Sequence, residues 1–344
     1  MQSKAHTSST GLWLGAGFGA AAGLALRHIV RARREIDFAG KIVLITGGSR
    51  GLGIVLARQF GQAGAHVAIC ARDEQEVSRA VADLQRRGVS AVGFPCDVTS
   101  RDEVEGLMRK VREHFGRIDV LVNNAGSIQV GPMEVMTVED YEAAMKLHFY
   151  APLFTTLAVL PEMRSRHAGR IVNISSIGGK VAAPHLLPYS ASKFALVGFS
   201  EGLRSELLKD GIYVTTVCPG LMRTGSPRNA LFKSQHRKEY AWFAISDATP
   251  GLSISAERAA ARIIQACKYG QAETMVSVPS RLATAFHGLF PGITAELNAV
   301  INGVLPKAGG IGTEQRTGKR SESFAAPSVL TTLNERQAVK NNEM

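Results

Sequence analysis

The chain has 344 residues, of which 45% are hydrophobic, and its formal net charge is +11. This length and apolar content allow one large core or two small ones, which excludes a fibrous protein and a chain disordered throughout. The positive residues are scattered without a dominant basic run, so we do not expect a nucleic-acid partner. The four cysteines lie far apart without metal-ligand spacing, which predicts reduced thiols in a cytoplasmic compartment and no metal site.

Residues 5–26 contain no Asp, Glu, Lys or Arg. As a helix this run would extend about 33 Å, enough to cross a bilayer core of about 30 Å. Gly15, Gly19 and Gly23 recur every four residues, a spacing that allows close helix packing in lipid. Most of the nearby positive charge follows the run, which favours an uncleaved membrane anchor within residues 1–37 and a cytoplasmic domain after it. A peripheral helix on an otherwise soluble cytoplasmic protein is the alternative.

From residue 38 to 283, apolar strands alternate with helices. The first unit is KIVLITGGSRGLGIVLARQFGQAGAHVAICARD, which predicts a strand, a glycine turn, a helix and a second strand. Strands that are apolar throughout and alternate with helices predict a parallel sheet covered on both faces. We therefore expect an α/β domain with a doubly wound parallel sheet, a Rossmann fold. Its later helices are expected at 74–87, 101–116, 139–166 and 189–209, and its later strands at 89–98, 118–126, 169–176 and 212–220.

The chain changes character after this domain. Residues 284–306 are expected to form one or two short amphipathic helices, against the domain or against a membrane surface. From residue 307 to 344 the sequence is polar, rich in Gly, Ser, Thr and Asn, and without an apolar period. This composition predicts a disordered tail.

The segment TGGSRGLG, residues 46–53, lies between the first strand and the first helix. Glycines at such a turn let the backbone approach a pyrophosphate that the helix N-terminus holds. The turn therefore predicts a dinucleotide cofactor, with glycines required only for packing as the alternative.

The choice between NADP and NAD depends on the end of the second strand. A carboxylate there accepts from the ribose 2′-OH of NAD, whereas an arginine pairs with the 2′-phosphate of NADP. Arg72 and Asp73 stand side by side in CARD, and Arg50 adds a second cation within the glycine turn. We interpret this pattern as NADP(H) preferred over NAD(H). Asp97, after the next strand, is either an adenine contact or a turn-forming aspartate.

Tyr189 and Lys193 stand four residues apart in YSASK. On a helix they share one face, where a cation favours the phenolate and allows a phenol to exchange protons. A surface tyrosine beside a solvated lysine is the alternative for these residues alone.

The motifs TGGSRGLG, NNAG, NISS, YSASK and CPG follow one another along residues 40–280. In this order they resemble the short-chain dehydrogenase/reductase family. The resemblance implies that Tyr189 donates or accepts the proton, that Lys193 binds the nicotinamide ribose and lowers the pKa of the tyrosine, and that Ser176 orients the substrate oxygen. Asn123 belongs to the NNAG segment that packs against adenosine in the family. The cofactor-binding residues expected on this basis are Thr46, Gly47, Ser49, Arg50, Gly51, Leu52, Gly53, Arg72, Asp97, Val98, Asn124, Ala125, Gly126, Tyr189, Lys193, Pro219, Gly220 and Thr224.

One position departs from the family pattern. His148 takes the place of an asparagine that commonly positions a water in the proton relay behind the lysine. Histidine also bonds water, so we expect a rate that is reduced but not abolished. The departure leaves two hypotheses: an NADP-dependent oxidoreductase acting on a carbonyl or secondary alcohol, or a non-catalytic NADPH sensor or membrane scaffold.

The region 224–255 is long and stands where the family has its substrate lid. Phe232, Tyr240, Trp242 and Phe243 are expected either to cover an apolar substrate or to pack the lid onto its own domain. With the anchor, this favours a lipophilic small-molecule substrate. The resemblance also implies a homo-oligomer formed through helices near 105–165 and 189–209.

Overall fold

The computed structural model describes residues 31–328 and 331–343, so the predicted anchor at residues 5–26 lies outside the described part. At the centre is a seven-stranded sheet in the order β11-β7-β6-β4-β1-β2-β3, and every neighbouring pair is parallel. This arrangement confirms the predicted doubly wound α/β fold. The strands are β1 Ile42–Thr46, β2 His66–Ala71, β3 Ala91–Pro95, β4 Val120–Asn123, β6 Gly169–Ile174, β7 Ile212–Val217 and β11 Glu273–Thr274.

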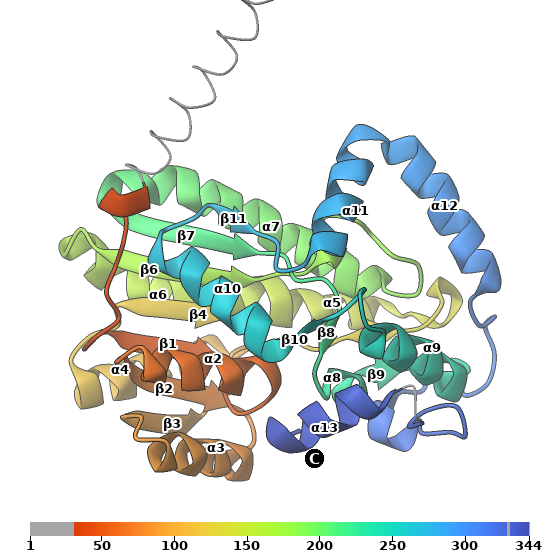
Figure 1. The fold of residues 1–344 in the computed structure, drawn as a ribbon, viewed down its shortest axis with the longest axis horizontal. Helices are drawn as coiled ribbons and strands as arrows, with labels where there is room; N and C mark the ends of the chain where they lie inside the picture. The colour runs from red at the N-terminus through yellow and green to blue at the C-terminus, as the bar shows by residue number, and fades with distance from the viewer. Residues whose placement is uncertain (1–30, 329–330, 344) are drawn as a thin grey trace, which may run out of the picture.

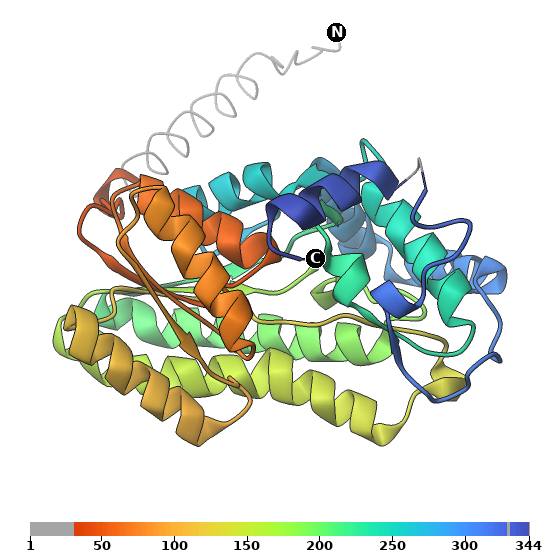
Figure 2. The ribbon, with the colours of Figure 1, turned by 90° about the horizontal axis from the view of Figure 1, so that it is seen from below.

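Helices cover both faces of the sheet (Figures 1 and 2). On one face lie α2 Gly51–Gln62, α3 Glu74–Arg86 and α10 Ala256–Lys268. On the other lie α4 Arg101–Phe115, α5 Val138–Met145, the π-helical turn η2 Lys146–Tyr150, α6 Ala151–Ser165 and α7 Leu187–Leu207. Each layer buries apolar side chains against strands that are apolar on both sides, which is why the strands lack alternation.

The helix α4 illustrates how the sequence forms these elements. Val104, Leu107, Met108 and Val111 are its buried residues, and their spacing places them on one face of a helix. The side chain of Ser100 caps the first turn by accepting from the Glu103 backbone N–H. Short 3₁₀ turns join other elements, at η1 Met133–Val135, η3 Ile177–Gly179, η4 Leu208–Asp210 and η5 Gly318–Arg320.

One helical stretch, residues 138–165, is by length and composition sufficient to cross a membrane, among the residues that the structure describes. It comprises α5, η2 and α6, which pack against α7 and α4 beside the sheet. Core helices of soluble proteins pass the same test, so we attach no membrane role to it.

The expected lid region folds as a small unit beside the sheet. Its elements are β8 Met222–Arg223, α8 Ser226–Asn229, β9 Leu231–Phe232, α9 His236–Ala248 and β10 Ile254–Ser255. Strand β8 pairs with β10, and β9 lies between β5 Gln129–Val130 and β12 Arg316–Thr317. Phe232, Tyr240 and Phe243 are buried in a separate apolar cluster of this unit. These aromatics therefore pack the lid onto its own domain, the second of the two arrangements considered from the sequence.

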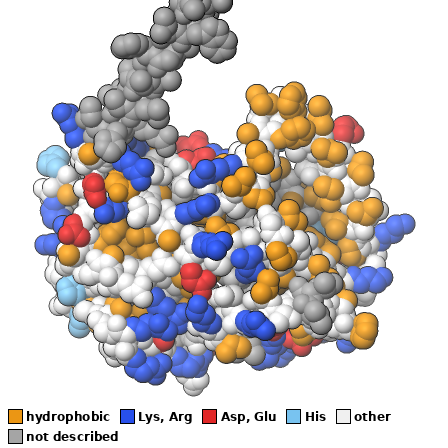
Figure 3. Space-filling model, viewed as in Figure 1, with side chains coloured by type: hydrophobic (Ala, Val, Ile, Leu, Met, Phe, Trp, Pro, Cys, Tyr) orange, Lys and Arg blue, Asp and Glu red, His pale blue; other side chains and the backbone are white. Residues whose placement is uncertain are grey.

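Two helices follow, α11 Val278–Leu289 and α12 Pro291–Val304. α11 begins before the predicted boundary at residue 284. The pair rises away from the sheet in Figure 1, and its apolar side chains form an orange surface in Figure 3. Only Ser280 and Thr294 are buried along the two helices. The pair therefore presents apolar residues to its surroundings instead of packing one face against the domain.

The predicted disorder of residues 307–344 is wrong for the part that the structure describes. Strand β12 pairs with β9, and α13 Thr332–Lys340 packs beside α9. Ala326, Ala338 and Asn341 are fully buried. The segment lacks an apolar period because it is held mostly by polar contacts. A prediction of disorder from composition does not detect a segment that polar contacts order. Figure 2 shows α13 on the same side of the sheet as α2.

Candidate active site

The carboxyl ends of the parallel strands carry almost all the predicted site residues. The glycine turn follows β1, Arg72 follows β2, Asp97 follows β3, the NNAG loop follows β4, Ser176 follows β6 and the loop 219–224 follows β7. Parallel strands end at one edge, so these segments converge there, where open α/β sheets bind their ligands.

Ser176, Tyr189 and Lys193 lie together at this edge. Tyr189 and Lys193 are on α7, and the ammonium lies 5.8 Å from the centroid of the phenol ring. Ser176 accepts a 3.0 Å hydrogen bond from the Gly178 N–H, and a hydrogen bond links its hydroxyl to Tyr189. Its neighbour Ser175 is buried and donates to the Lys193 carbonyl instead. Ser176 is thus the serine placed to meet a substrate oxygen beside the phenol.

Burial sets the protonation of both groups on α7. It raises the pKa of Tyr189 to about 12, against a hydrogen bond from Ser176 that lowers it. It lowers the pKa of Lys193 to about 7. The upward shift of the Tyr189 pKa is opposite to the lowering that the family resemblance implies, and Lys193 is not among its causes. At neutral pH the phenol holds its proton and can donate it.

Lys193 has more hydrogen-bond donors on its ammonium than the described residues accept. Its ammonium is buried and donates a 2.8 Å hydrogen bond to the Ile174 carbonyl, its one hydrogen bond among the described residues. An ammonium carries three donors. The remaining donors fit ribose hydroxyls, the partner that the family resemblance implies.

His148 is buried in the π-helical turn η2, and its ring lies edge-on to Tyr189 at 5.4 Å. Its Nε2 accepts from the Ser127 N–H at 3.2 Å, so the proton is on Nδ1, which lies 2.8 Å from the Ser192 hydroxyl. Burial, with a smaller effect of the Lys193 charge, lowers the pKa of His148 well below its usual value. Both nitrogens are engaged and the ring is neutral. His148 positions the Ser127 loop against α7.

The glycine turn is built for close backbone approach. A Cβ on Gly53 would lie 2.0 Å from the Gly47 carbonyl oxygen, and Gly47 itself has φ +61° with Ala125 behind it. The NNAG loop is tied to this turn, because the Asn124 side chain donates to the carbonyls of Thr46 and Gly47 at 3.0 Å each. The cradle and the N-terminus of α2 fit a dinucleotide pyrophosphate.

The two cations expected near the adenosine, Arg72 and Arg50, lie at the same edge of the sheet but differ in exposure and pairing. Arg72 is exposed, and Asp73 caps α3 by accepting from the Glu76 N–H. Arg50 is paired with Glu76 at 2.9 Å, and Ser49 donates to the same carboxylate. Arg72 is therefore the more accessible cation for a 2′-phosphate, and Asp73 already has a structural partner.

Other predicted positions have local partners. Asp97 accepts from the N–H and hydroxyl of Thr99, the turn-forming role considered from the sequence. Val98 is buried in the core, and the buried hydroxyl of Thr224 bonds Ser226 at 2.8 Å. Asn123 donates to Asn173 on the neighbouring strand β6 and accepts from Thr155 on α6, so it ties the sheet to this helix.

The tail adds residues that the sequence did not indicate. Gly51, the first residue of α2, donates its N–H to the Asn341 carbonyl at 3.0 Å. Glu343 is buried and accepts from the Gly225 N–H at 2.6 Å. From α9, Asp247 is also buried, and one of its carboxylate oxygens has no hydrogen-bond partner among the described residues. Burial raises the pKa of Asp247 to about 8. No motif marks these residues, because their position depends on how the tail returns to the sheet edge.

Comparisons with known proteins agree with this arrangement. The sequence model of the short chain dehydrogenase family matches residues 41–233. A dehydrogenase/reductase SDR family protein 7-like of Anopheles gambiae is 40% identical over 198 residues, which cover 56% of this chain and 62% of that protein.

Two solved structures share the fold. A short-chain dehydrogenase from Streptomyces avermitilis is 30% identical with a TM-score of 0.67, covering 78% of this chain and 99% of that one. A variant of actinorhodin polyketide ketoreductase, solved with NADPH, is 33% identical with a TM-score of 0.63, covering 71% and 97%. With more than half of its residues matched by the family model, this chain belongs to the short-chain dehydrogenase family.

Proposed function

We propose that the protein is an NADPH-dependent reductase that converts the carbonyl group of a lipophilic small molecule into an alcohol. The observation that carries the proposal is the cluster of Ser176, Tyr189 and Lys193 beside the glycine turn, at one edge of a parallel sheet. The protonated phenol favours the reductive direction, because reduction needs an acid at the developing alkoxide.

Each of the three clustered residues has a separate role in the proposed reaction. The Ser176 hydroxyl donates a hydrogen bond to the substrate oxygen, and Tyr189 gives that oxygen its proton as negative charge develops. The Lys193 ammonium holds the ribose and supplies positive charge behind the phenol. The nicotinamide cofactor, when bound, supplies the hydride.

NADPH is preferred here over NADH on two grounds. Arg72 is exposed at the end of β2, where it can pair with a 2′-phosphate. The actinorhodin ketoreductase, similar in structure to this chain, was solved with NADPH.

The test is NADPH consumption with a panel of apolar ketones and aldehydes, comparing the full chain with Tyr189→Phe. We expect the variant to lose about 100-fold or more in kcat, with NADPH affinity changed by less than about twofold. Tyr150→Phe, an exposed tyrosine on η2, is the matched control and should keep its rate. A Tyr189→Phe variant as active as the parent would refute the proposed acid.

A non-catalytic NADPH sensor is the second candidate. It is favoured by His148, whose two ring nitrogens are both occupied by Ser127 and Ser192 and so lack the free group of a water relay. The same experiment separates the two functions. A sensor would bind NADPH tightly, but neither the parent nor Tyr189→Phe would consume NADPH with any member of the panel.

We also propose that the protein works at a membrane, with its catalytic domain in the cytoplasm. The apolar run at residues 5–26, followed by Arg27, Arg31, Arg33 and Arg34, supports an anchor. The helix pair α11 and α12 supports a second, peripheral contact. Its exposed large apolar side chains, 40% to 81% accessible, are Val278, Leu282, Phe286, Leu289, Phe290, Ile293, Leu297, Val300, Ile301 and Val304.

Sedimentation with vesicles of neutral and anionic lipid tests both contacts in the full chain. Phe18→Arg with Ala22→Arg should remove the anchor's contribution, because each arginine costs about 3 kcal/mol at the centre of a span. Adding Leu289→Asp with Val304→Asp should then abolish the remaining binding, whereas Leu208→Asp, an exposed leucine on η4, should not. A parent chain that does not sediment with either kind of vesicle would refute the membrane proposal, and retention of the fourfold variant in the pellet would refute the two contacts assigned to it.

We also propose that the protein forms a homo-oligomer through α6 and α7, because large apolar side chains are exposed there. Tyr150, Leu157 and Phe194 are 44%, 54% and 42% accessible on that side of the molecule. Light scattering of the purified chain and of Leu157→Arg should show a larger species for the parent and a smaller one for the variant.

A further inference from the structure

The last residues of the chain lie on the segment that receives the cofactor phosphates. Asn341 accepts from the Gly51 N–H at 3.0 Å, the donor at the start of α2 that the glycine turn offers to a pyrophosphate. Next to it, the Oε1 of Glu343 lies 3.1 Å from the position that a Cβ on Gly51 would take. The Oε2 of Glu343 accepts from the Gly225 N–H, in the loop after Thr224.

Asn342 extends this contact toward the adenosine side. Its side-chain amide donates to the Ser49 carbonyl at 3.0 Å and to the Glu76 carbonyl at 3.2 Å. Ser49 and Arg50 are held by Glu76 in the same place. The three tail residues thus run from the pyrophosphate end of the turn to the cations near the ribose.

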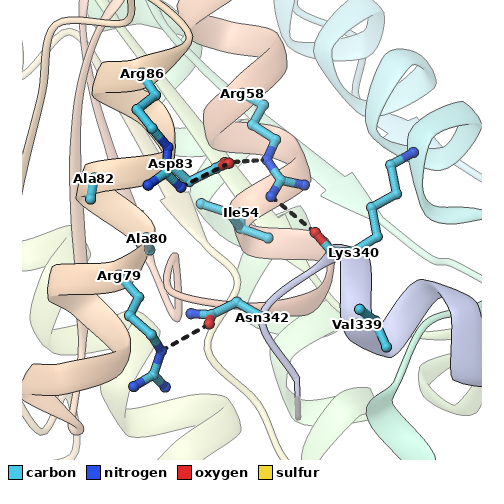
Figure 4. A pocket seen from close by; sticks show the side chains of 10 residues that line it. All are labelled: Ile54, Arg58, Arg79, Ala80, Ala82, Asp83, Arg86, Val339, Lys340 and Asn342. Carbon is cyan, nitrogen blue, oxygen red and sulfur yellow. Dashed lines mark hydrogen bonds and ion pairs between the residues drawn. The ribbon is translucent and has the colours of Figure 1, made fainter.

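A second set of contacts fastens the tail from behind, in the hollow between α2, α3 and α13 that Figure 4 shows. Arg58 donates to the Asn341 side chain at 2.9 Å and to the Lys340 carbonyl at 3.0 Å, and it is itself paired with Asp83. Arg79 donates to the Asn342 side chain at 3.2 Å. Asn341 is fully buried by these contacts.

We infer that residues 341–343 form an internal plug that occupies the phosphate-binding part of the cofactor site, and that NADPH binds only when this plug is released. One N–H of Gly51 cannot donate fully to both the Asn341 carbonyl and a phosphate oxygen, so the two compete. The acidic side chain of Glu343 also opposes a diphosphate in the same place. Binding is therefore weakened by the fraction of molecules whose plug is closed.

This inference rests on the proposed cofactor and is tested by NADPH titration of the parent chain and three altered chains. A chain that stops at Lys340 lacks the plug but keeps α13, and Asn341→Ala with Asn342→Ala removes the contacts to Arg58, Arg79, Ser49 and Glu76. Both should bind NADPH about tenfold more tightly than the parent, as expected if about one molecule in ten is open. Asn302→Ala, an exposed asparagine on α12, is the control and should match the parent.

Hydrogen exchange of the unaltered chain provides a test that does not depend on a variant folding. Saturating NADPH should speed exchange of the amides in residues 333–343, because the released plug loses its partners. Equal or weaker binding by the shortened chain, or slower exchange of these amides with NADPH, would overturn the plug alone. Failure of every chain to bind NADPH or NADH would overturn the proposed function and the plug together.

Discussion

At the residue scale, the histidine beside the active-site tyrosine has a role that its environment defines. His148 is buried, and its low pKa means that the folded protein holds it neutral. The unfolded chain binds a proton on this ring below about pH 6.5, so acid favours unfolding. Lys193, whose pKa is about 7 in the folded protein, is charged in both states below that pH and adds no slope there.

We therefore predict that His148→Asn flattens the acid side of the stability curve. Between pH 6.5 and 5, the parent should lose up to about 1.4 kcal/mol per pH unit more than the variant. Urea unfolding at several pH values measures this difference. His114→Gln, an exposed histidine on α4, should keep the parental slope. An unchanged slope in His148→Asn would mean that the ring is charged in the folded state.

Cofactor choice is also decided by single residues. Arg72 is exposed, whereas Arg50 is already paired with Glu76. Arg72→Gln should weaken NADPH binding about tenfold and leave NADH binding unchanged, because only NADPH carries the 2′-phosphate. Titration with both nucleotides measures the ratio. Arg86→Gln, at the far end of α3, is the control, and an equal loss of NADPH affinity there would point to a general charge effect.

At the scale of elements, one buried ion pair joins the lid unit to α5. The Lys233 ammonium lies 2.5 Å from the Asp140 carboxylate, and both side chains are less than 5% accessible. Asp140 also accepts from the Thr137 N–H and from Gln129. The basic residues of the lid are therefore not equivalent: Lys233 is structural, and Arg237 and Lys238 stay exposed.

Lys233→Met should lower the free energy of unfolding by about 3 kcal/mol or more, because it leaves a buried carboxylate without its charged partner. Lys238→Met, on the exposed side of α9, should change it by less than about 0.5 kcal/mol. Urea unfolding compares the two. Equal effects of the two substitutions would show that the buried pair contributes little.

At the scale of the whole molecule, the last described residues of the chain lie against the glycine turn that follows the first strand. Burial raises the pKa of Glu343 to about 7, with a bond from the Gly225 N–H acting against the shift. Arg50 of the turn faces this carboxylate with positive charge, and Glu76 of α3 and Asp247 of α9 face it with negative charge. The closed plug thus binds a proton that the released plug gives up.

The sign of the pH effect follows from that proton. A raised pKa in the closed state means that closure is most favourable at low pH and weakens as pH rises from about 4.5 toward 7. NADPH should therefore bind the parent more tightly at pH 8 than at pH 5.5, relative to Glu343→Gln, by about tenfold. Taking the ratio to Glu343→Gln cancels the titration of the nucleotide itself. A ratio that does not change with pH would contradict the role of Glu343, and Glu296→Gln on exposed α12 should show the parental profile.

Much of the fold could be predicted because its signals are local. Apolar strands, the glycine turn and the spacing of Tyr189 and Lys193 each depend on a few neighbouring residues, and parallel strands bring their carboxyl ends together by geometry alone. The choice of Ser176 over Ser175 followed from the family interval. Its physical reason, the bond from Ser175 to the Lys193 carbonyl, is visible only in the folded chain.

By itself, the sequence determined the doubly wound sheet, the place of the site at its edge and the identity of the residues that gather there. Only the tertiary structure decided the state of those residues. Burial, which depends on the whole surrounding shell, sets the protonation of Tyr189, Lys193 and His148. The tail was missed for the same reason: polar groups such as those of residues 341–343 become ordered by partners nearly 300 positions away, as in the bond from Asn342 to Ser49, and composition carries no information about such pairs.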